Sequence, residues 1–104
     1  MVMIVAYVRS LRAPALLRTL HGRGIGVTAF LVHGLSVEKS TFLYSSHPFE
    51  PAHLPEAVKI EVVCNEEIVD EVVALIAKEA KTGEPGDGII ATLAVDRFMR
   101  IRDM

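Results

Sequence analysis

Apolar residues recur along the chain with two different periods, and these periods predict four strands and two helices. Runs of β-branched, aromatic and other apolar residues predict buried strands at 3–8, 27–32, 58–63 and 89–94. After the first of these runs, Pro14 is well placed in a first helical turn, and Leu16, Leu17 and Leu20 follow at helical spacing. A first helix is therefore expected between the first two strands.

A second helix is predicted between the third and fourth strands. Asn65 is a suitable N-cap, and the acidic residues Glu66 and Glu67 favour the positive end of a helix. Apolar residues then repeat at i, i+4, i+7 and i+8, and this face comprises Ile68, Val72, Leu75 and Ile76. The pattern continues to about Lys81.

The resulting element order, βαββαβ, predicts an α+β fold of the ferredoxin-like type. In this arrangement two helices cover one face of a four-stranded antiparallel sheet, and right-handed crossovers join the elements compactly. No internal repeat or linker divides the sequence, so residues 1–104 are expected to form a single domain. Many functions occur on this fold, so the fold alone does not identify one.

A long interval without regular periodicity separates the second and third strands. It extends from Gly34 to about Ala57 and includes Pro48, Pro51 and Pro55. An irregular segment of this length is unusual in so small a domain and is typical of a functional loop. We expect it to be exposed and poorly ordered without a partner.

Composition narrows the function classes. Apolar residues make up 51% of the chain, and the mean hydropathy of +0.38 is high for a small soluble domain, so part of the apolar surface is expected in a subunit interface. The net charge of −2 gives no reason to expect nucleic acid as a partner. The first apolar run is interrupted at Arg9 and is too short to insert in a membrane, and a lone Cys64 fits the reducing cytoplasm.

Two segments have the chemistry of an anion site. The glycine-rich stretch 82–88 could present its backbone amides to a phosphate, although a plain turn between helix and strand is the alternative. Arg100 and Arg102 alternate near the end of the chain, so on an extended segment they would face the same side and reach one phosphate chain. The alternative is a solvated basic edge.

Metal binding and catalysis are less well supported by the residues. No CxxC or HxxxH pair is present, and solvated histidines and a buried apolar cysteine are the simpler interpretation. The candidate metal donors are His33, His47, His53 and Cys64. No nucleophile can be placed beside a base, and Asp87, the nearest candidate, is interpreted as a turn residue, so no enzyme is predicted.

The motifs of the second half resemble those of PII signal-transduction proteins. The run Lys-Thr-Gly-Glu-Pro-Gly-Asp-Gly-Ile-Ile at 81–90, followed by Arg-Ile-Arg at 100–102, resembles their C-terminal signature. Residues 58–63 resemble their third strand, and the interval 34–59 matches the length of their T-loop. The sequence of the glycine-rich run and the cysteine at the end of the third strand most resemble a divergent PII-like group associated with heavy-metal efflux transporters.

This resemblance implies a homotrimer that binds an adenine nucleotide in clefts between subunits. The T-loop would span about 34–57, the glycine-rich B-loop about 82–88 and the C-terminal segment 95–104. By position, the nucleotide contacts would come from Thr28, Gly34, Leu35, Ser36, Val37, Glu38, Glu61, Val63, Gly86, Asp87, Gly88, Ile89, Arg100 and Arg102. Glu61 and Val63 would lie at the adenine, and 86–88 at the phosphates.

The chain departs from the family pattern in ways that change the expected ligand. Ile89 stands where the family usually has lysine, and Ser36, Val37 and Glu38 replace glycine, arginine and glutamine. Fewer positive charges favour AMP or ADP over ATP. The implied function is that of a cytoplasmic regulator that signals through its T-loop, with a membrane transporter as a candidate target. The alternative is a trimeric metal-binding or metal-sensing protein of heavy-metal tolerance.

Overall fold

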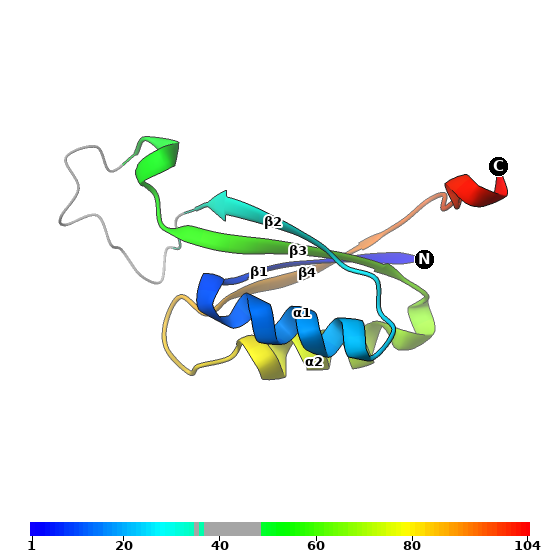
Figure 1. The fold of residues 1–104 in the computed structure, drawn as a ribbon, viewed down its shortest axis with the longest axis horizontal. Helices are drawn as coiled ribbons and strands as arrows, with labels where there is room; N and C mark the ends of the chain where they lie inside the picture. Colours follow the sequence, from blue (N-terminus) through cyan, green and yellow to red (C-terminus); the bar gives the residue numbers. More distant parts are fainter. Residues whose placement is uncertain (35, 37–48) are drawn as a thin grey trace.

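A computed structural model of the chain describes residues 1–34, 36 and 49–104. Its elements follow the predicted order βαββαβ (Figure 1). The strands are β1 (Val2–Arg9), β2 (Thr28–His33), β3 (Glu56–Cys64) and β4 (Gly88–Ala94), and the helices are α1 (Ala13–Gly22) and α2 (Val69–Ala80). Most of the predicted T-loop lies outside the described part of the chain. Four candidate residues lie there with it: Leu35, Val37, Glu38 and His47.

The four strands form one sheet in the order β2-β3-β1-β4, with every neighbouring pair antiparallel. Both helices cover the same face of this sheet (Figure 1). The ferredoxin-like α+β fold predicted from the element order is therefore confirmed. Among the described residues, neither helix has the length and apolar character needed to cross a lipid bilayer.

The core lies between the two helices and the covered face of the sheet. Alternate residues of β1 and β3 point into it, since successive side chains of a strand face opposite sides. The fully buried large side chains are Ile4, Leu16, Leu20, Ile60, Val62, Val72 and Ile76. Each such side chain stabilises the fold by about 1.5 to 3 kcal/mol relative to exposure.

The opposite face of the sheet is uncovered and largely apolar. By register Tyr7, Phe30, Val63 and Leu93 share this face and are between 38% and 50% exposed, and Ile89 at the start of β4 is 63% exposed. In the middle of this face Lys59 Nζ lies 3.2 Å from Glu61 Oε2. We call this surface the open face; both helices of the described residues lie on the other face of the sheet (Figure 1).

Two predicted boundaries are wrong by a few residues. A 3₁₀ turn (Glu66–Ile68) precedes α2, and Asn65 makes no capping bond with its side chain; its carbonyl instead accepts a 3.1 Å hydrogen bond from the Ile68 amide. β3 begins at Glu56, so the irregular interval ends at Pro55 and not near Ala57.

β4 can pair with β1 only because its first residue is glycine. Gly88 lies opposite Val8 and has a φ of +119°, a backbone conformation that residues with a side chain rarely adopt. A Cβ at this position would lie 1.8 Å from the carbonyl oxygen of Tyr7. Backbone of the neighbouring strand cannot give way as a flexible side chain would, so any larger residue must displace the start of β4.

We expect Gly88→Ala to lower the free energy of unfolding by about 2 to 4 kcal/mol, because strained backbone and a clash with the central strand act together. Urea unfolding at a fixed protein concentration measures this. Gly26→Ala is the matched control, since a Cβ there meets nothing within 4 Å and the backbone is not left-handed. Equal stability of the two variants would contradict the close approach described above.

Candidate ligand-binding site

The glycine-rich loop between α2 and β4 folds around the carboxylate of Asp87. The amides of Thr82 and Gly83 donate to Asp87 Oδ2 at 2.8 and 2.9 Å, and the Thr82 hydroxyl donates to Oδ1. The amide of Glu84 in turn donates to the Thr82 hydroxyl oxygen at 3.2 Å. The first half of the loop is thus held by its own side chains.

Arg9, the last residue of β1, fixes this loop to the sheet. Its Nε donates to Asp87 Oδ1 at 3.0 Å, and its Nη2 donates to the Pro85 carbonyl at 2.9 Å. About a quarter of each side chain of the Arg9–Asp87 pair is exposed, so water screens the pair only in part. A planar guanidinium with several donors suits two such contacts at once.

The hydrogen bonds to Asp87 hold its pKa well below the ordinary value. The largest cause is the Thr82 hydroxyl, followed by the Thr82 amide. Desolvation opposes them and comes next in size, and Arg9 and the Gly83 amide contribute less in the lowering direction. The carboxylate is therefore charged throughout the neutral range. It can organise the loop, but it is a poor proton donor or acceptor near neutrality.

The base of the long loop lies at the same end of the sheet. The Gly34 amide donates to the Pro55 carbonyl at 2.9 Å and closes this loop where β2 ends and β3 begins. β2 and β4 are separated by three strand spacings, roughly 14 Å. Gly34 and Ser36 thus belong to the same end of the sheet as Gly86 and Gly88, but they lie at its opposite edge.

The residues expected at the adenine occupy the open face. Thr28 lies opposite Glu61 in the register of β2 with β3, so the structure brings these two together. Val63 follows on the same face, one side-chain repeat farther along β3. Glu61 is already paired with Lys59, which also lies 5.7 Å from the centre of the Phe30 ring.

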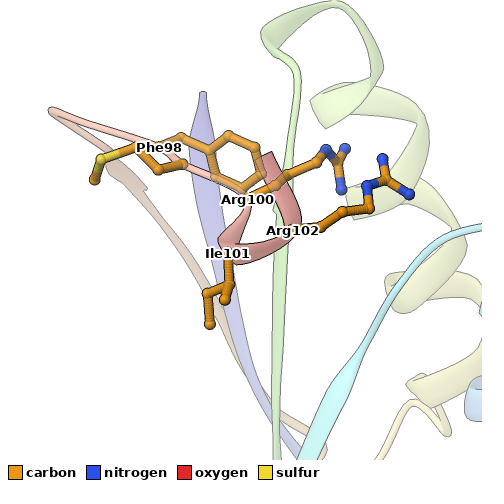
Figure 2. Close-up of a pocket in the computed structure, with 5 residues that line it drawn as sticks. Phe98, Arg100, Ile101 and Arg102 are labelled. Carbon is orange, nitrogen blue, oxygen red and sulfur yellow. The ribbon is translucent and has the colours of Figure 1, made fainter. Parts of the chain in front are cut away.

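The two arginines lie beyond the end of β4, on a C-terminal segment that projects past the sheet (Figure 1). A 3₁₀ turn (Ile101–Asp103) contains Arg102, so this segment is not extended throughout. Both side chains nevertheless extend to the same side (Figure 2). Arg100 Cζ lies 5.3 Å from the centre of the Phe98 ring, and these residues line a shallow open hollow.

The structure does not bring the glycine-rich loop and the arginines together within one chain. The loop precedes the first residue of β4, and Arg100 and Arg102 follow its last residue. The strand alone spans about 20 Å, and the C-terminal segment continues away from the loop (Figure 1). One nucleotide could contact both elements only if they came from different copies of the chain.

The candidate metal donors are also dispersed. His33 lies opposite Glu56, at the start of β3, in the register of β2 with β3. Cys64 is buried at the other end of β3, and this burial raises the pKa of its thiol. His53 Nδ1 lies 3.6 Å from Glu50 Oε2. Within residues 1–34, 36 and 49–104 no three histidine, cysteine or acidic side chains are grouped to hold a metal ion.

Sequence reasoning named Asp87 but missed the two residues that hold it, Thr82 and Arg9. Thr82 is five positions from Asp87, and a threonine and an aspartate in one glycine-rich turn are a local signal for such a bond. Arg9 carries no comparable signal, because it lies more than seventy residues away from its partners. Only the pairing of β1 with β4 makes it a neighbour of the loop.

Comparison with known proteins gives the family. The family model described as nitrogen regulatory protein P-II matches residues 1–104. A nitrogen regulatory protein P-II of Rhizobium etli is 34% identical over 104 residues, covering 98% of this chain and 92% of the relative. A nitrogen regulatory protein P-II 2 of Methanothermobacter thermautotrophicus is 38% identical over 101 residues, covering 95% and 87%.

The chain therefore belongs to the nitrogen regulatory protein P-II family, which confirms the resemblance seen in its motifs. It is accordingly a regulatory protein of this family. Its place in the divergent group associated with heavy-metal efflux stays a prediction.

We expect Asp87 to titrate below the ordinary aspartate pKa of about 3.9, and Thr82→Val to raise its midpoint toward that value. The sign follows from linkage: a lowered pKa stabilises the loop above the ordinary pKa, and this stabilisation is lost as the pH falls through the folded value. Carboxyl-detected NMR measures both midpoints. Thr92→Val on β4 is the control, and an ordinary midpoint in the unmodified chain would contradict the hydrogen bonding.

Proposed function

We propose that this P-II family regulator binds an adenine nucleotide in clefts between copies of the chain and signals through the long loop that begins at Gly34. One observation carries the proposal: two elements suited to an anion, the glycine-rich loop and the arginine pair, lie beyond opposite ends of β4 in the same chain. They can meet only across an interface, and the open face supplies the apolar surface on which such an interface can form.

A homotrimer is the assembly that the family resemblance implies, and the open face supports an association of this kind. Half-exposed aromatic and aliphatic side chains would be removed from water when copies meet. Each cleft would then combine the glycine-rich loop of one copy with Arg100 and Arg102 of the next. Thr28, Glu61 and Val63 would supply the wall at the adenine.

The charges at the cleft favour a nucleotide with few phosphates. Arg100 and Arg102 are the cations of the C-terminal segment expected to face the ligand, and Arg102 is already near Asp103, with Nε 3.4 Å from Oδ1. Ile89, directly after the glycine-rich loop, provides no charge and is 63% exposed. AMP or ADP therefore suits the site better than ATP, because fewer negative charges have to be offset.

The position of the long loop links binding to a signal. Its base, closed by the bond between Gly34 and Pro55, lies at the same end of the sheet as the glycine-rich loop. A ligand held there would contact both loops and bias the conformation of the long one. The recipient would be a protein in or facing the cytoplasm, and a membrane transporter is the candidate that the family resemblance suggests.

We expect light scattering to give a mass three times the 11.4 kDa of the chain. Leu93→Glu should dissociate the assembly, because it places a charge on the open face, where Leu93 is 50% exposed. Leu11→Glu is the matched control: Leu11 is 94% exposed on the turn before α1, away from this face. A monomer at micromolar concentration would contradict the inter-copy cleft.

We expect Arg100→Ala to weaken nucleotide binding about tenfold or more, since an arginine–phosphate contact contributes roughly 1.5 to 3 kcal/mol. Arg18→Ala removes an equal charge from the exposed side of α1 and serves as the control. Calorimetric titration with AMP, ADP and ATP measures the three affinities. If none of them binds the unmodified protein at millimolar concentration, the proposal is wrong and the metal-binding alternative takes its place.

We expect Ile89→Lys to improve binding of ATP more than that of AMP, because the added charge lies beside the glycine-rich loop where the phosphates would end. The same titrations give the ratio of the two affinities. An equal gain for both nucleotides would mean that phosphate number is not sensed at this position.

A further inference from the structure

The Asp87 carboxylate occupies the place that a bound anion would take in the first half of the glycine-rich loop. It accepts hydrogen bonds from the Thr82 and Gly83 amides, the Thr82 hydroxyl and the Arg9 guanidinium, so four donors converge on its two oxygens. Two backbone amides and a cation around one negative group are the recognition pattern of a phosphate site. Here the protein's own side chain satisfies it.

Arg9 connects this internal anion to both loops at that end of the sheet. Its side chain holds Asp87 and the Pro85 carbonyl, while its backbone faces Ala57 in the register of β1 with β3. Ala57 in turn lies opposite Val32, close to the base of the long loop. One residue of the central strand thus sets the position of the glycine-rich loop relative to the start of β3.

We propose that Arg9 and Asp87 are positioning residues that lock the glycine-rich loop before any ligand arrives. The lock fills the amides of Thr82 and Gly83, so these two amides are not available to a phosphate. The lock itself is a property of the free protein, and its effect on ligand affinity rests on the nucleotide-binding function proposed above.

The lock has a signature that a direct phosphate contact lacks. If only a fraction of the molecules holds the loop in its competent form, the apparent affinity falls by that fraction for every ligand. Loss of Arg9 or Asp87 should therefore weaken AMP, ADP and ATP by one common factor. Arg100, as a group that contacts phosphate, should affect the three ligands unequally, because its contribution depends on the number of charges it meets.

Amide hydrogen exchange of the free protein, followed by NMR, tests the lock without any ligand. Asp87→Asn leaves one oxygen for four donors, and we expect the Thr82 and Gly83 amides to exchange at least about tenfold faster. Arg9→Met should have a smaller effect on the same two amides. The control is Arg23→Met, which breaks the exposed Arg23–Glu71 pair, where Nη1 and Oε1 are 3.3 Å apart. Unchanged exchange of both amides in Asp87→Asn would overturn the lock.

Calorimetry with the three nucleotides then tests the positioning role. We expect Asp87→Asn and Arg9→Met to lower all three affinities about five- to tenfold by a common factor, and Arg9→Lys to restore part of the loss. Faster amide exchange with unchanged affinities would overturn the positioning role and leave the lock. Absence of binding by the unmodified protein would overturn the nucleotide function and the positioning role together, while hydrogen exchange would still decide whether the lock exists.

Discussion

The antiparallel pairing of β1 with strands on both of its sides is the constraint on which the other features of this chain depend. β1 lies between β3 and β4 and, among the strands of the described residues, it alone contacts both. Alternation then assigns its residues: Ile4 and Ala6 enter the core beneath the helices, whereas Tyr7 remains on the open face. The last residue of the same strand, Arg9, supports the glycine-rich loop. The core, the open face and the support of the glycine-rich loop are thus all set by one register.

The fold was largely predictable from the sequence because its signals are local. Helical spacing after Pro14, the apolar repeat from Ile68 and the alternation in 58–63 each report a single element. Boundaries were less predictable, since they depend on backbone geometry. The acidic residues after Asn65 form a 3₁₀ turn before α2 begins, and the carbonyl of Asn65, not its side chain, closes that turn.

The candidate site was predictable only where its residues form a motif that is local in the sequence. The glycine-rich run and the Arg-Ile-Arg sequence pointed to anion chemistry, and the structure adds that these elements lie beyond opposite ends of β4 within one chain. Support from Arg9 could not be read from the sequence, because it arises when the first and last strands of the chain become neighbours. A site assembled across copies has the same property at a larger scale: no single sequence position reveals its partner.

The hydrogen bond from the Gly34 amide to the Pro55 carbonyl has a consequence for how such a regulator can diversify. It closes the long loop at its base, so the sheet is insulated from what the intervening sequence contains. Closing a longer loop adds little cost, about 0.6 kcal/mol for each doubling of length. Descendants of one scaffold can therefore exchange this segment while the sheet beneath it stays the same.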